Sequence, residues 1–208
     1  MIDLTLISLF IPTFFLVSIT PGLCMTLAMT LGMSIGIRRT LWMMAGEVLG
    51  VAAVAMAAVL GVAAIVTKTP ELFVILKVFG AAYLAYIGVQ MWRSKSKLSV
   101  NLASMEKPVN SGRLSLFNQG FFTAIANPKG WAFMISLLPP FINKNYALPP
   151  QLIVLVGIIM ISEFLCMLIY AMGGKSVAKL LSSQNNEKRL NQISGSLMIA
   201  VAMWLLLS

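Results

Sequence analysis

The sequence is poor in the side chains that most enzymes and metal proteins use. It has no histidine and only two cysteines, Cys24 and Cys166, each within an apolar run. Without histidine the chain lacks the commonest metal ligand and the commonest proton carrier near neutral pH, and two cysteines cannot form a disulfide scaffold. No cluster of nucleophile and base or of metal ligands is visible. We therefore expect neither an enzyme nor a bound cofactor or metal.

Charged residues are also scarce. They make up 10% of the 208 residues, whereas hydrophobic residues make up 59%, and the mean hydropathy is +0.92. A water-soluble domain carries roughly a quarter charged residues, so this chain has too few polar side chains to cover itself in water. No stretch has the composition of a linker to a second domain. Composition therefore predicts an all-α integral membrane protein whose residues 1–208 form a single transmembrane domain.

Six apolar segments are long enough to cross a bilayer as helices. A hydrocarbon core of about 30 Å needs about 20 helical residues. The segments are residues 4–33, 40–66, 71–92, 114–141, 151–172 and 190–207. We predict six transmembrane helices in two halves of three, at about residues 1–92 and 114–208, joined by a linker of residues 93–113.

The net charge of +9 is distributed as a membrane topology requires, which argues against a nucleic-acid partner. The connections after the second and fourth segments carry only Lys68 and Lys144. Most other basic residues follow the first, third and fifth segments: Arg38, Arg39, Arg93, Lys95, Lys97, Lys107, Arg113, Lys175, Lys179, Lys188 and Arg189. The positive-inside rule then predicts a cytoplasmic linker and both termini outside.

Two of the segments contain a helix-breaking motif near their middle. The first has Thr20-Pro21-Gly22, and the fourth has Asn127-Pro128-Lys129-Gly130. Proline removes a backbone donor and disfavours helical geometry at the preceding residue. Because three spans per half is an odd number, the second half enters the membrane from the opposite side, as in an inverted repeat. Broken helices at equivalent places mark the binding site of a transporter, and their N-termini suit a carboxylate. The alternative is two kinks that only shape packing.

Three charged residues lie deep within the predicted spans: Glu47, Lys129 and Glu163. A charge at the bilayer centre costs about 3 kcal/mol on insertion scales, so such residues usually face a cavity or one another. We predict one polar centre in which Lys129 pairs with a glutamate when the site is empty and is released by protonation or by substrate. A purely structural ion pair, or a water-facing Glu47, is the alternative. The predicted translocation residues are Thr20, Pro21, Gly22, Glu47, Asn127, Pro128, Lys129, Gly130 and Glu163.

Small residues recur at four-residue spacing in and between the first two spans. Gly32 and Gly36 form one such pair, and Gly46 and Gly50 form another. This spacing lets helices approach closely and predicts packing contacts rather than a functional site. Trp131, just after the second break, is expected either to cap a substrate chamber or to pack as an ordinary core indole.

The order of these motifs resembles the lysine-exporter (LysE/RhtB) family. The matching motifs are T-P-G at 20–22, G-x-x-x-G at 46–50, G-A-A-Y-L-A-Y-I-G at 80–88 and N-P-K at 127–129. The resemblance covers essentially the whole chain. It implies a bacterial inner-membrane secondary transporter that exports amino acids or close derivatives, driven by the proton gradient. Composition and spacing by themselves indicate only a secondary transporter, and they leave a homo-oligomer open.

The sequence departs from the family pattern in the first span. The usual signature is T-P-G-P-N, whereas Leu23 and Cys24 replace the second proline and the asparagine here. An asparagine at a broken helix can coordinate an ion or substrate, so specificity does not carry over with the resemblance. Two other classes stay open: a membrane thiol-redox conduit using Cys24, and a scaffold or channel without gradient-driven transport.

Overall fold

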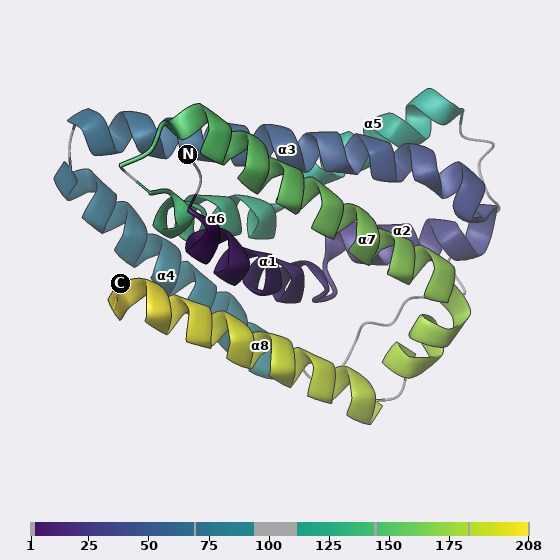
Figure 1. Ribbon diagram of the computed structural model, residues 1–208. Helices are drawn as coiled ribbons and strands as arrows, with labels where there is room; N and C mark the ends of the chain where they lie inside the picture. Colours follow the sequence, from purple (N-terminus) through teal and green to yellow (C-terminus); the bar gives the residue numbers. More distant parts are fainter. Residues whose placement is uncertain (1–2, 69, 94–111, 144, 183, 208) are drawn as a thin grey trace.

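The computed structural model describes residues 3–68, 70–93, 112–143, 145–182 and 184–207, and these ranges contain helices and turns but no strand (Figure 1). The predicted all-α class is confirmed. The helices are α1 (Leu4–Ser18), α2 (Leu23–Ile35), α3 (Ile37–Lys68), α4 (Pro70–Arg93), α5 (Arg113–Ile125), α6 (Pro128–Leu137), η2 (Pro139–Phe141), α7 (Leu148–Ser182) and α8 (Gln184–Leu207). Residues 94–111, most of the predicted linker, lie outside the described residues.

The helices follow the predicted apolar segments. The first segment is α1 and α2, which are bent by 60° at the first break. The fourth segment is α5 and α6. Ile37–Gly61 of α3 and Leu148–Gly174 of α7 are each long and apolar enough to cross a membrane, and the bent α1–α2 pair makes a third span if counted as one. The full six-span inverted repeat stays a prediction.

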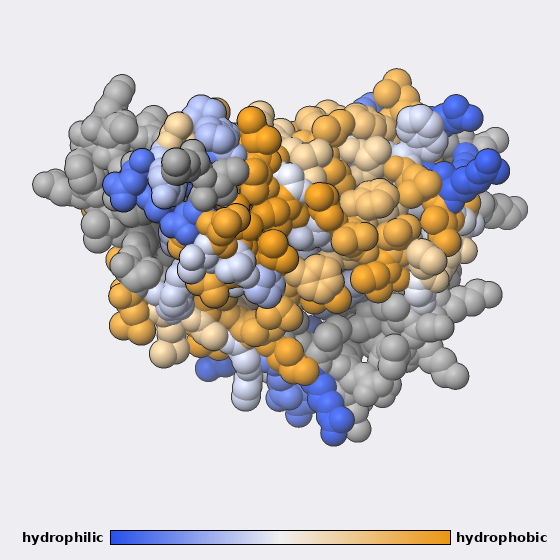
Figure 2. All heavy atoms as spheres, viewed as in Figure 1, coloured by the Kyte–Doolittle hydropathy of each residue, from blue (hydrophilic) through white to orange (hydrophobic). Residues whose placement is uncertain are grey.

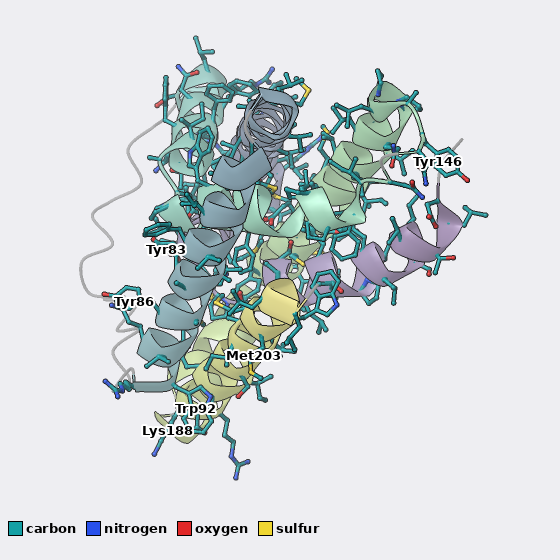
Figure 3. All side chains as sticks on the ribbon, turned by 90° about the vertical axis from the view of Figure 1, so that its left-hand side faces the viewer. Tyr83, Tyr86, Trp92, Tyr146, Lys188 and Met203 are labelled. Carbon is teal, nitrogen blue, oxygen red and sulfur yellow. The ribbon has the colours of Figure 1, made fainter. Side chains whose placement is uncertain are left out.

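Successive helices run between two ends of the molecule. The α2–α3 turn, the start of α5 and the start of α8 lie at one end, and the C-termini of α3 and α8 lie at the other (Figure 1). Trp92 of α4 and Lys188 of α8 lie close together, and Tyr146 lies far from both (Figure 3). The Trp92 indole donates a 2.8 Å hydrogen bond to the Ser196 hydroxyl there. The side of the membrane on which each end lies stays a prediction from the charge distribution.

The outer surface is largely apolar. Large hydrophobic side chains cover much of the face in view, and hydrophilic ones gather toward its margins (Figure 2). Phe79 is 72% exposed and Ile153 is 74% exposed. Such a surface is unfavourable in water and favourable against lipid tails. The chain is therefore built as a membrane protein, in agreement with its composition.

Glycines bring the helices into backbone contact. A Cβ atom at Gly46 of α3 would lie 1.9 Å from the Phe117 carbonyl oxygen of α5, and one at Gly120 would lie 1.9 Å from the Met43 carbonyl oxygen. Gly88 of α4 and Gly195 of α8 meet in the same way, and Gly195 follows Gly88 by the same number of residues as Pro128 follows Pro21. The close approach predicted from the small residues of α3 is confirmed.

Gly36, which was also predicted to be a packing glycine, has a different role. A Cβ atom at Gly36 would meet nothing within 4 Å, so Gly36 is not a packing residue. Its backbone φ is 80°, in the region that favours glycine, and it separates α2 from α3. The four-residue spacing from Gly32 is coincidental, because Gly36 is required by the turn.

Candidate functional site

The first break exposes backbone groups between α1 and α2. The α1 helix ends at Ser18, and α2 begins after Gly22, whose extended backbone caps it without a side-chain hydrogen bond. Pro21 lies between them and cannot donate to the preceding turn. The carbonyl of Ile19, left over at the end of α1, accepts a 2.9 Å hydrogen bond from the Tyr170 hydroxyl of α7. This contact stabilises the broken geometry from outside the span.

The second break is stabilised within its own span. Asn127 is the N-cap of α6, where its side-chain oxygen accepts a 3.1 Å hydrogen bond from the Lys129 backbone N–H. Pro128 occupies the first helical position, which needs no backbone donor. The Trp131 indole donates a 2.8 Å hydrogen bond to the Ile125 carbonyl at the end of α5. Trp131 therefore bridges the break instead of closing a chamber.

The two breaks face each other. The Lys129 ammonium group donates hydrogen bonds to the Thr20 hydroxyl and, at 3.4 Å, to the Thr20 carbonyl. The Asn127 amide donates to the Cys24 thiol across 3.6 Å. A Cβ atom at Gly22 would lie 3.7 Å from the Lys129 ammonium nitrogen. The motifs of the two halves thus form one site.

A small cavity lies at this junction. It is lined by seven of the predicted residues: Thr20, Gly22, Glu47, Asn127, Lys129, Gly130 and Glu163. Pro21 and Pro128 shape the breaks without lining the cavity. Apolar side chains complete the wall, and the Phe133 ring lies 5.7 Å from the Lys129 ammonium nitrogen. The space enclosed by these side chains is small, about 50 Å³, which is enough for a few water molecules.

The two carboxyl groups have different surroundings. Glu163 of α7 is half-buried and accepts a 2.9 Å hydrogen bond from the Ser18 hydroxyl. Glu47 of α3 is 1% exposed, and neither of its oxygens has a hydrogen-bond partner among the described residues.

The predicted pairing of Lys129 with a glutamate is not present in this conformation. No ion pair between Lys129 and either glutamate occurs in the described part of the chain; the ammonium group bonds Thr20. The physical reason is the helix break, which frees the Thr20 carbonyl and lets it compete with the carboxyl groups for Lys129.

Sequence reasoning missed three residues of this site. Ser18 and Tyr170 act through hydroxyl groups, and Cys24 lines the cavity beside Asn127. Ser18 could have been predicted from the sequence, because it lies just before the first break. Cys24 occupies the position where the family signature has asparagine, which also marked it. Tyr170 had no such sequence signal, since its partner is a backbone carbonyl distant in sequence.

Known proteins that resemble this chain are membrane proteins, and one of them is named an efflux protein. The chain is 28% identical over 186 residues to the homoserine/homoserine lactone efflux protein of Salmonella typhimurium, covering 89% of this chain and 88% of the relative. It is 28% identical over 189 residues to an uncharacterized membrane protein of Vibrio cholerae, covering 90% of each. No solved structure matches. Residues 15–208 match the family described as LysE type translocator, so the chain belongs to that family.

Proposed function

We propose that this protein exports small amino acids or close derivatives, such as homoserine, through the cavity between the two helix breaks. The observation that carries the proposal is the meeting of both breaks around one cation and two carboxyl groups. A translocator needs a polar site that both sides of the membrane can reach in turn, and broken helices supply one.

The chemistry of the cavity suits a zwitterion. The α2 N-terminus is capped without a side-chain hydrogen bond, and Lys129 lies beside it. Backbone N–H groups and the positive end of a helix dipole favour a carboxylate there. Glu47 and Glu163 offer acceptors for an ammonium group. The apolar side chains of the wall suit contact with a short aliphatic side chain.

The name of the Salmonella relative supports the choice of substrate class. Homoserine and homoserine lactone share a primary amine, whereas only homoserine has a free carboxylate. The relative thus handles compounds whose constant feature is the amine. This chain has two acidic groups in its cavity, which fits amine recognition.

Export is driven by the proton gradient in this proposal. Proton entry from outside protonates a cavity carboxyl, and substrate or proton binding releases Lys129 from Thr20 and lets the breaks rearrange. The protein lies in the bacterial inner membrane with residues 93–113 in the cytoplasm and both termini outside. Reporter tags at residues 1 and 208 should be accessible from outside, and a tag at 101 should be protected. A protected C-terminus would contradict this orientation.

The test is homoserine efflux from proteoliposomes loaded with labelled substrate, with and without an imposed proton gradient. Lys129→Met should abolish efflux. Lys188→Met is the matched control, because it removes an exposed cation at the end of the molecule, far from the breaks (Figure 3). A variant with both cysteines changed to alanine should still export, since transport needs no thiol chemistry. Gradient-independent leakage in the wild type would indicate a channel instead.

A further inference from the structure

Glu47 lies beside a close backbone contact between α3 and α5. It follows Gly46, whose backbone touches the Phe117 carbonyl of α5, and a Cβ atom at Gly120 would lie 2.9 Å from the Glu47 backbone nitrogen. Neither helix can rotate there without a backbone clash. The side chain is 1% exposed and lines the cavity. Its position is therefore fixed by packing and owes nothing to hydrogen bonds of its own.

The Glu47 carboxyl group lacks a donor in the described structure. Burying a polar group without a partner costs roughly 1–3 kcal/mol, and more if the group is charged. Natural proteins keep such groups mainly where something binds them. The missing partner has to donate hydrogen bonds and to carry positive charge if Glu47 is ionised.

The charged and titratable groups around Glu47 do not supply a positively charged partner: the nearby Cys24 thiol is a weak, uncharged donor. The groups that face the same cavity are Cys24 of α2, Lys129 of α6 and Glu163 of α7, and the α5 residue in the wall is Ala124. The Lys129 ammonium is committed to Thr20. The cavity is thus lined by one cationic side chain, Lys129, and by two carboxyl groups, Glu47 and Glu163. With both carboxyls ionised, the cavity carries one negative charge in excess and accepts one more positive charge.

We propose that Glu47 binds the ammonium group of the exported substrate and holds a proton that this ammonium displaces. The proposal rests on the proposed export function and adds two requirements to it. The substrate has to carry a free, positively charged amine. Each binding event exchanges one cation for another: the Glu47 carboxylic acid gives its proton to water, and the carboxylate then accepts hydrogen bonds from the substrate ammonium.

Glu163 is less suited to this exchange. One of its oxygens already accepts a hydrogen bond from Ser18, so it has a partner when the cavity is empty. Neither oxygen of Glu47 accepts a hydrogen bond in the described structure, so an ammonium group should bind more favourably to Glu47 than to Glu163. We assign Glu163 to the Ser18 contact and to balancing Lys129.

The experiment measures binding to the purified full-length protein by titration calorimetry. The ligands are L-homoserine, N-methyl-L-homoserine, which adds bulk but keeps the charge, and N-acetyl-L-homoserine, which loses the charge. Titrations in two buffers of different ionisation enthalpy give the number of protons released. The variants are Glu47→Gln and Glu47→Asp. Ser162→Ala is the control, because Ser162 is a buried polar residue of α7 that does not line the cavity.

The wild type and Ser162→Ala should bind both charged ligands, discriminate against the acetylated one, and release about one proton per homoserine. Glu47→Gln should bind homoserine roughly 10- to 100-fold more weakly, release no proton and lose the discrimination. Glu47→Asp should keep part of both properties. A purely structural Glu47 predicts that Glu47→Gln lowers the melting temperature while ligand preference and proton release stay unchanged, and that result overturns the proposal.

Other outcomes separate this inference from the export function. Equal binding of homoserine and its acetylated form, with export intact, overturns the role of Glu47 and leaves transport standing. Binding that requires sodium ions and releases no proton assigns Glu47 to a metal cation and overturns it as well. If the wild type binds none of the three ligands, the inference fails for this substrate class, and the efflux assay decides separately whether the protein exports another amino acid.

Discussion

Two alanine substitutions in the same helix should change stability in opposite directions. Gly46 and Gly61 both lie within α3. A Cβ atom at Gly46 would lie 1.9 Å from the Phe117 carbonyl oxygen, whereas one at Gly61 would have nothing within 4 Å. The obstacle at Gly46 is backbone, so no side-chain rotation relieves it. Ordinary contact begins at 3.4 Å, so α3 and α5 have to separate by roughly 1.5 Å.

The magnitudes follow from two terms. Alanine in place of glycine stabilises a helix interior by about 1 kcal/mol, and this gain applies at both positions. Overpacking costs about 1–3 kcal/mol, and a rigid backbone contact belongs at the upper end. Gly46→Ala should thus destabilise by about 2 kcal/mol, and Gly61→Ala should stabilise by up to about 1 kcal/mol. At roughly 2–4 °C per kcal/mol for a chain of this size, their melting temperatures should differ by roughly 6–12 °C.

The assay is thermal unfolding of both purified variants in the same detergent, together with efflux at a temperature where both are folded. Gly46→Ala should also export more slowly, because it displaces the neighbouring Glu47 from the cavity, while Gly61→Ala should export normally. A Gly46→Ala protein that melts at or above the temperature of Gly61→Ala would refute the close α3–α5 packing and the placement of Glu47 that depends on it.

Other perturbations probe the site and the helix ends. Lys129→Met combined with Glu163→Gln should fold and stay inactive in efflux, because Lys129 acts as a carrier residue; restored export would show a structural charge pair instead. Lys129→Arg should retain at most part of the activity. Tyr170→Phe leaves a carbonyl at the end of α1 unpaired, so chemical or thermal unfolding should show a loss of about 1–3 kcal/mol; an unchanged midpoint would mean that water replaces the hydroxyl. The Asn143 amide, 2.9 Å from the Asp3 carboxylate, holds the pKa of Asp3 below its usual value. The ionised Asp3 carboxylate contributes its full stabilisation above the usual carboxyl pKa of about 4, and this contribution is lost as pH falls through the lowered pKa. The melting temperature of the wild type should therefore fall more on acidification than that of Asp3→Asn. Parallel curves for the two proteins would exclude this role.

The sequence determined where the helices lie and where they break. Apolar runs define the helices because a membrane chain has to satisfy its backbone groups locally. The breaks at Pro21 and Pro128 were predictable for the same local reason, since a proline removes its own donor and restricts its neighbour whatever surrounds it. Asn127 and Pro128 also form a standard helix start that can be read from the order of residues. Seven of the nine predicted translocation residues then line one cavity.

Spacing alone could not separate packing glycines from turn glycines. Gly46 and Gly36 stand in equivalent patterns, but one touches a neighbouring backbone and the other adopts a positive φ. The difference depends on which helix lies opposite and on where the chain turns. The spacing of glycines along the sequence predicts neither property.

Only the tertiary structure decided the partners of the charged groups. The sequence offered Lys129 two glutamates, yet the ammonium bonds the Thr20 hydroxyl and carbonyl. Tyr170 likewise bonds the Ile19 carbonyl, and Glu47 is left without a donor in the described structure. The physical reason is common to these cases. A broken helix creates backbone acceptors that no side-chain pattern reveals, and the packing of α6 and α7 against the α1–α2 break determines which cation or hydroxyl reaches them.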